Sequence, residues 1–260
     1  MRSILFILFF TLFILLAIPA PAISAEPSGP IVVLKLDDMV NQNGDIPFRW
    51  RAVIDHLQKE KIKFSIGIIC NSLETNAPTY LSALTELAQS GSVELWNHGY
   101  DHNRWDENGT LFFEFKGPGE EQQHEHFKKS QDLAKEKLGV ELVTFGAPFN
   151  AVDATTAKVL ALFPEIKVWL YGAPIDSAGK FVRSQIERID LENPVHRPNL
   201  ASLEKGMQER PNEPCYILQG HPNSWGKPEF AEFVRIIDFL KSINAHFTLP
   251  RELPVSVPAS

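Results

Sequence analysis

Short apolar runs alternate with amphipathic stretches along most of the chain. Residues 31–37 form a mostly apolar run typical of a buried strand, and residues 48–61 place Val53, Ile54 and Leu57 on one helix face. The alternation continues as far as residue 249. It predicts further strands over 63–69, 93–96, 142–145, 167–171, 215–219 and 246–249, and further helices over 78–89, 120–138, 154–162 and 228–242.

Strands and helices in this order predict a mostly parallel sheet with right-handed crossover connections. We therefore expect an α/β fold, in which seven or eight such units would close into a barrel or a distorted barrel. Two stretches lack the periodic pattern. Residues 99–119 are rich in glycine and aromatic residues and predict a long loop, and the proline-containing residues 173–214 predict an elaborated loop region.

The length and composition of the chain favour one large core. The chain has 260 residues, of which 44% are hydrophobic and 22% are charged, so a disordered chain is excluded. Barrels of this length are often undivided, and we expect a single domain over residues 26–260. The net charge of −7 comes without a basic stripe, which argues against nucleic acid as a partner.

Residues 1–25 have the pattern of a secretory signal peptide. Arg2 precedes an apolar segment over residues 4–18, and small residues then offer cleavage sites after Ala22 or Ala25. The alternative is an uncleaved anchor, although about 20 apolar residues are normally needed to span a bilayer. We predict an exported protein, periplasmic or secreted, with no stable membrane span after cleavage.

The two cysteines are predicted to stay apart. Cys70 lies at the end of one predicted strand and Cys215 at the start of another. In a parallel sheet these positions are at opposite edges, roughly 15 Å apart at about 3.3 Å per residue. A disulfide needs Cα atoms within about 7 Å. We therefore expect two buried thiols.

Acidic residues and histidines follow three of the predicted strands. Asp37 and Asp38 end the first strand, His98 and His102 follow the strand over 93–96, and His221 follows the strand over 215–219. The carboxyl ends of strands are where α/β folds gather catalytic groups. One Asp with two His is a ligand set for a divalent metal with an open position, and the other Asp and His could move protons. The pattern predicts a metal-dependent hydrolase.

In this order the clusters resemble the motifs of the polysaccharide deacetylase family (NodB homology, similar to carbohydrate esterase family 4). The family's Thr-Phe-Asp-Asp motif corresponds to residues 35–38, and its His-Thr/Ser-x-x-His motif corresponds to residues 98–102. The Arg-x-Pro-Tyr motif is matched only partly, by residues 146–149, and Leu-x-x-His is matched by residues 218–221. The resemblance extends from about residue 31 to residue 249 and implies a deacetylase barrel, a distorted (β/α) barrel of about seven parallel strands.

The resemblance also implies roles for these residues. Asp38, His98 and His102 would hold a divalent metal, with Zn²⁺ the expected ion. Asp37 would act as the general base, and His221 would protonate the departing amine. The substrate would contact Pro148 and Phe149, where a backbone N–H is a candidate oxyanion donor.

One motif departs from the family pattern. Gly146 stands where family members usually have the arginine that orients the base. Lys35 lies two residues before Asp37, so both side chains point to the same face of the strand. Lys35 is therefore predicted to take the place of the arginine as the cation beside Asp37. The alternative is that Lys35 pairs with Glu94, and the two interactions are compatible.

Three further residues are candidates for supporting the site. Trp105 in the long loop and Trp225 after His221 are predicted to stack on sugar rings, with core or lid packing as the alternative. Asp101 lies in the loop between His98 and His102 and is expected to bond a histidine and so orient it.

We expect a metal-dependent hydrolase that removes N-acetyl groups from a polysaccharide or cell-envelope glycan. Two alternatives stay open. One is a secreted glycan-binding protein of the same fold without catalysis, for which the absent arginine is the main support. The other is a deacylase that acts on a non-sugar amide or an O-acetyl ester. The sequence does not determine the glycan or the oligomeric state.

Overall fold

The computed structural model describes residues 29–172, 179–183 and 189–253, and its centre is an eight-stranded sheet. Along the sheet the strands follow the order β10, β1, β2, β3, β6, β7, β8, and β9 also pairs with β1. Every pairing in this sheet is parallel. The strands are β1 (Ile31–Met39), β2 (Phe64–Ile68), β3 (Val93–Asn97), β6 (Thr144–Phe145), β7 (Val168–Leu170), β8 (Phe181–Arg183), β9 (Tyr216–Gly220) and β10 (His246–Phe247).

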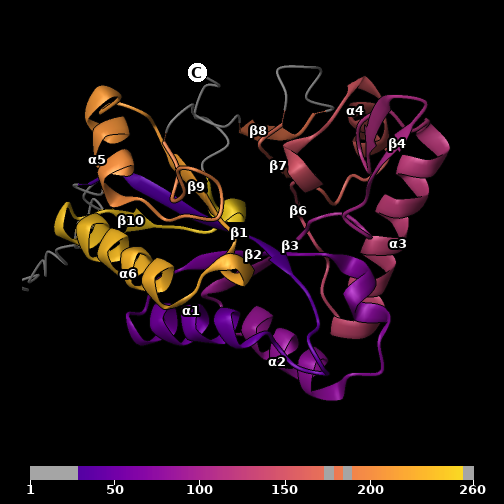
Figure 1. Ribbon diagram of the computed structural model, residues 1–260. Helices are drawn as coiled ribbons and strands as arrows, with labels where there is room; N and C mark the ends of the chain where they lie inside the picture. Colours follow the sequence, from indigo (N-terminus) through magenta and orange to yellow (C-terminus); the bar gives the residue numbers. More distant parts are fainter. Residues whose placement is uncertain (1–28, 173–178, 184–188, 254–260) are drawn as a thin grey trace, which may run out of the picture.

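Helices surround this curved sheet. In the view of Figure 1, α1 and α2 lie below it, α5 and α6 lie to the left, and α3 and α4 lie to the right. Among the described residues no pairing joins β8 to β9, so the barrel is open between these two strands. The predicted distorted (β/α) barrel is confirmed. The helices are α1 (Phe48–Lys59), α2 (Pro78–Gln89), α3 (Glu120–Leu138), α4 (Ala154–Ala161), α5 (Leu200–Glu209) and α6 (Lys227–Ser242).

Strand β1 separates two environments, because its side chains alternate between opposite faces. Val32, Leu34 and Leu36 are fully buried in the large core that also includes the inner faces of α1 and α6. Val33 belongs to a separate cluster inside the barrel, together with Trp96 and Ile217. By the same alternation, Lys35 and Asp37 point into the barrel interior, where they are also fully buried.

The region over residues 173–214 is more regular than its sequence predicts. It contains β8 and the ten-residue helix α5. Asn199 caps α5 by accepting a hydrogen bond from the N–H of Ser202 at 3.0 Å, and Leu203 and Met207 are buried. The prolines that predicted an irregular region stand before and after this helix, where they are compatible with helical structure.

The predicted long loop over residues 99–119 contains a hairpin. Strands β4 (Arg104–Glu107) and β5 (Thr110–Phe113) pair antiparallel to form a second, two-stranded sheet. The turn between them includes Asn108 and Gly109, both at positive φ. Asn-Gly is a strong hairpin signal that the alternation of larger elements conceals.

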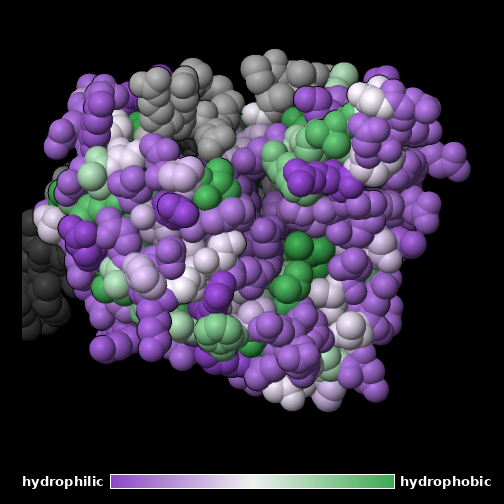
Figure 2. Space-filling view, viewed as in Figure 1, coloured by the Kyte–Doolittle hydropathy of each residue, from purple (hydrophilic) through white to green (hydrophobic). Residues whose placement is uncertain are grey.

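Both cysteines are buried and are not joined to each other, which confirms that prediction. The predicted signal peptide over residues 1–25 lies outside the described residues. Among residues 29–172, 179–183 and 189–253, no helix combines the length and apolar composition that crossing a membrane requires. The face seen in Figure 2 carries mostly hydrophilic residues, and its hydrophobic residues form small separate areas.

Candidate metal centre and catalytic groups

The pairing register brings the predicted site residues to one end of the sheet. Strand β1 lies between β9 and β2, and β2 pairs in turn with β3 (Figure 1). Leu36 is opposite Gly220, which places His221 beside Asp37 at the carboxyl ends of neighbouring strands. Asn97 ends β3, so His98 enters the same edge two strands away.

Asp38, His98 and His102 converge on one point. The Nε2 atoms of His98 and His102 both lie 3.1 Å from Oδ1 of Asp38, and one ligand atom from each residue lies within 4.8 Å of the others. Nδ1 of His98 donates to the carbonyl of Gly146 at 2.6 Å, so Nε2 is the ring atom that faces Asp38. Two imidazole nitrogens and one carboxylate oxygen in this arrangement fit a divalent metal with open positions.

The charges in this cluster affect one another strongly. Burial raises the pKa of Asp38, but hydrogen bonds from His102 and His98 outweigh burial and hold it well below its usual range. Burial lowers the pKa of His102, but the hydrogen bond to Asp38 and the charge of Asp38 outweigh burial, so the pKa of His102 is raised. The carboxylate is therefore ionised and available as a ligand at neutral pH.

Asp37 is more deeply buried than Asp38, and two side chains donate hydrogen bonds to the same one of its carboxylate oxygens. Nζ of Lys35 and Nε2 of Gln219 both lie 2.5 Å from Oδ2 of Asp37. Oδ1 is buried and has no hydrogen-bond partner among the described residues. Gln219 is oriented by Asn150, whose Nδ2 donates to its Oε1 at 3.1 Å. Asp37 thus has one fixed oxygen and one oxygen able to accept a proton.

Lys35 pairs with Asp37 and not with Glu94. Its Nζ lies between the rings of Trp96 and Tyr171, 4.9 Å from each centroid, in a cation–π arrangement. Glu94 instead accepts from Thr144 Oγ1 at 2.5 Å and from the N–H of residue 251 at 2.8 Å. Burial raises the pKa of Glu94, which removes the need for a cation beside it.

Gly146 leaves room for this arrangement. A Cβ atom there would lie 2.8 Å from the ring of Trp96 and 3.4 Å from Cε of Lys35. The space that a larger side chain at position 146 would need is therefore filled by Trp96 and Lys35.

His221 is paired with Glu192, a residue that the sequence analysis did not identify. Nδ1 of His221 lies 2.7 Å from Oε2 of Glu192, whose carboxylate also accepts the N–H groups of His221 and His196. Burial lowers the pKa of His221, but Glu192, Asp37 and Asp38 outweigh burial and raise it to about 9. His221 is therefore protonated at neutral pH, with its Nε2 proton free to be transferred.

Trp225 supports this pair and does not present a face to a substrate. Its side chain is 2% exposed, its Nε1 donates to Oε1 of Glu192 at 2.7 Å, and its ring packs on Phe233. The absence of a side chain at Gly220 makes room for this ring. The predicted sugar-stacking role of Trp225 is thus corrected to packing behind His221.

The other two predicted contacts, Trp105 and Asp101, meet residues of the hairpin and of α3. Trp105 stacks on Phe112 across the hairpin, with ring centroids 5.5 Å apart. Asp101 lies near a histidine, but this is His126 on α3, with Oδ1 of Asp101 3.8 Å from its Nδ1.

The third predicted motif packs directly against the cluster. Pro148 is buried at the start of a short 3-10 turn, Pro148–Asn150. Phe149 has a φ of 58° and is 40% exposed, and its ring centroid lies 4.3 Å from that of His102. This turn therefore packs against the metal cluster through the ring of Phe149.

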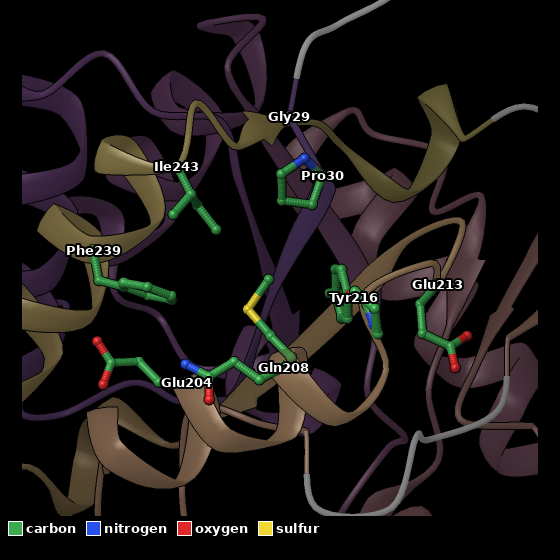
Figure 3. A pocket seen from close by; sticks show the side chains of 10 residues that line it. Gly29, Pro30, Glu204, Gln208, Glu213, Tyr216, Phe239 and Ile243 are labelled. Atoms are coloured by element: carbon green, nitrogen blue, oxygen red, sulfur yellow. The ribbon is translucent and has the colours of Figure 1, made fainter.

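Two of the cavities in the described part of the chain lie at opposite ends of the sheet. A cavity of about 400 Å³ at the carboxyl ends is lined by residues that include Asn150, Glu192, Gln219 and His221. A larger one, of about 600 Å³, lies at the amino ends, where Pro30, Phe239 and Ile243 face it (Figure 3). Of these two cavities, the smaller one is lined by a predicted catalytic residue, His221.

Comparison with known families identifies the family of the chain. The family model described as polysaccharide deacetylase matches residues 24–164, which is more than half of the chain. The chain therefore belongs to the polysaccharide deacetylase family. No curated protein matches the chain in sequence.

Solved structures of this family share the fold. A family 4 acetyl xylan esterase from Clostridium thermocellum, in complex with a cobalt ion, has a TM-score of 0.60 at 14% identity, covering 86% of this chain and 93% of its own. A peptidoglycan deacetylase from Bacillus subtilis has a TM-score of 0.55 at 13% identity, covering 84% and 86%. A carbohydrate esterase family 4 pseudoenzyme from Bacillus anthracis has a TM-score of 0.55 at 14% identity, covering 84% and 62%.

Proposed function

We propose that this protein is a metal-dependent deacetylase that hydrolyses N-acetyl groups of a polysaccharide or cell-envelope glycan. One observation carries the proposal: Asp38, His98 and His102 converge beside a buried carboxylate, Asp37, and a charged imidazole, His221. Family membership supports the reaction class, and the convergence supports the assignment of a metal site, a general base and a general acid.

Asp38, His98 and His102 would hold the metal. A divalent ion bound there would polarise the scissile carbonyl and lower the pKa of a bound water toward neutrality. Two nitrogen ligands and one oxygen ligand favour Zn²⁺, which takes three protein ligands in catalytic sites.

Asp37 is proposed as the general base. Lys35 and Gln219 hold its Oδ2, so its Oδ1 is the atom that takes the proton from the attacking water. A general base must keep a fixed orientation toward the proton that it removes. We propose that Lys35 provides this orientation and balances the buried negative charge.

His221 is proposed as the general acid. An amine is a poor leaving group until it is protonated, so the reaction needs a donor on the leaving-group side. Glu192 fixes the ring through Nδ1 and keeps the imidazole charged, which leaves the proton on Nε2 for the departing nitrogen. The roughly 400 Å³ cavity beside His221 is within the range of small-molecule sites.

The turn over residues 148–150 is proposed as the substrate-binding segment. The ring of Phe149 packs on His102, and the N–H of Phe149 is the candidate second donor to the developing oxyanion. Trp105 remains a proposed sugar contact on the hairpin, and Asp101 a proposed support of the metal loop. Export, to the periplasm or outside the cell, is proposed from residues 1–25.

A glycan-binding protein without catalysis is the second candidate. Gly146 in place of the arginine favours it, and a pseudoenzyme is among the structural neighbours. The Lys35–Asp37 pair argues for catalysis, because it supplies a cation to the base from another position.

The test is release of acetate from acetylated chito-oligosaccharides by the protein without residues 1–25. Release should stop after chelation and return when zinc is restored. Acetylated xylan and an acetylated peptide, tested in parallel, distinguish amide from ester and sugar from non-sugar substrates. Stoichiometric metal binding without release from any of them would favour the binding protein.

A further inference from the structure

The carboxylate of Glu114 lies against the loop that carries two of the proposed metal ligands, residues 98–102, called here the histidine loop. Glu114 follows β5 and is only 1% exposed. Its Oε1 accepts the backbone N–H of Tyr100 at 2.5 Å, and its Oε2 accepts the backbone N–H of His102 at 2.8 Å. One buried side chain thus satisfies two amide groups of the loop.

The carbonyl side of the same loop is held from another direction. The carbonyl oxygens of Gly99 and Tyr100 accept the N–H groups of Cys70 and Asn71, at 3.0 and 2.7 Å. Cys70 and Asn71 begin the short 3-10 turn that follows β2. The histidine loop therefore has two anchors, and Glu114 is the one on the amide side.

The loop is shaped to approach this carboxylate closely. Gly99 has a φ of +79°, and a Cβ atom there would lie only 2.5 Å from Oε2 of Glu114. His102 has a φ of +54°, a left-handed conformation that a non-glycine residue keeps only where its surroundings hold it. The bond from the N–H of His102 to Glu114 supplies such a restraint.

Helix α3 holds the carboxylate in turn. Nδ1 of His126 lies 3.2 Å from Oε1 of Glu114, and the ring of His126 packs on that of Tyr100 with centroids 5.1 Å apart. Glu114 is therefore fixed between α3 and the histidine loop, and its carboxylate holds the backbone N–H groups of Tyr100 and His102 in place.

We propose that Glu114 is a positioning residue of the metal site: its carboxylate holds the amide groups of the histidine loop and so fixes His102 opposite Asp38. The inference rests on the proposed metal-binding function. A carboxylate offers acceptors to both amides, whereas a glutamine would turn its NH₂ group toward one of them. Loss of the charge should therefore release one side of the loop and displace Nε2 of His102.

The experiment compares zinc affinity, measured by competition with a chromophoric chelator, between the wild-type protein and Glu114→Gln. The expected result is about 10- to 100-fold weaker binding, the usual range for loss of a group that orients a ligand. Glu94→Gln is the matched control, because Glu94 is an equally buried glutamate whose bonds go to Thr144 and Arg251. Its zinc affinity should equal that of the wild type.

Equal zinc affinity of Glu114→Gln and the wild type would overturn the inference, as would equal weakening by Glu94→Gln. Asp38→Asn separates this failure from failure of the proposed function. If Asp38→Asn also binds zinc as tightly as the wild type, the proposed metal site itself is wrong.

Hydrogen exchange in the wild-type protein tests the same contact without any substitution. The amides of Tyr100 and His102 should exchange slowly in the metal-free protein, in contrast to the amide of Gly109, whose bond to Oδ1 of Asp106 in the hairpin turn is exposed to solvent. Exchange of all three at similar rates would overturn the inference even if Glu114→Gln does not fold.

Discussion

Replacement of Lys35 by methionine removes the charge beside Asp37 and keeps a side chain of similar length. Both partners are fully buried and their charged atoms lie 2.5 Å apart, so no water can take the place of the ammonium group. Breaking a buried pair by removing one partner costs about 3–5 kcal/mol, because the remaining charge is uncompensated. Gln219 continues to bond Asp37, so we expect a loss near the lower end, about 3 kcal/mol.

The effect on turnover should be larger than the effect on metal binding. A positioned general base contributes about 100- to 10,000-fold to the rate, and this contribution depends on an ionised, correctly oriented carboxylate. We expect Lys35→Met to lower kcat about 100-fold or more while zinc content stays the same, since Lys35 does not contact Asp38, His98 or His102.

The assay combines steady-state kinetics of acetate release, zinc content and urea unfolding. In the double variant Lys35→Met, Asp37→Asn the uncompensated charge is gone, so most of the lost free energy of unfolding should return. A single variant Lys35→Met with unchanged kcat would refute the reasoning. So would a double variant that is destabilised by the sum of the single effects.

Two further substitutions test neighbouring parts of the site. Glu192→Gln removes a charge that raises the pKa of His221. Because a general acid works only below its pKa, the alkaline limb of the pH–rate profile should move down from about 9 by at least about one unit. An unmoved limb would exclude His221 as the acid. Gly146→Arg should reduce activity and cost about 1–3 kcal/mol of stability, because Trp96 and Lys35 fill the space beside position 146; increased activity would contradict this packing.

Much of the fold could be predicted because the core elements carry strong local patterns. The apolar run that forms β1 and the helix faces of α1 and α6 are buried as their periodicity indicates. Helix α5 and the hairpin β4–β5 are not predicted for a local reason: each lies among prolines or glycines that interrupt the pattern. Their signals, Asn199 as a cap and Asn108-Gly109 as a turn, are visible only at the scale of single turns.

The partners of the site residues could not be predicted in the same way. Gln219 meets Asp37 across 182 positions, and Glu192 meets His221 across 29. Such contacts depend on strand register and on loop paths that no local pattern encodes. Lys35 was predictable because it lies on the same strand face as Asp37. Trp225 was misassigned because proximity to His221 in sequence does not reveal which way the ring points.

The most direct test of the proposed metal-dependent hydrolysis compares two neighbouring carboxylates, Asp37 and Asp38, each replaced by asparagine. Zinc content and acetate release are measured on the same samples. If Asp38 is a metal ligand and Asp37 is the general base, Asp38→Asn loses both zinc and activity, whereas Asp37→Asn retains zinc and loses activity. Activity in Asp37→Asn at the wild-type level, or full zinc content in Asp38→Asn, would contradict the assignment of these two residues as base and ligand.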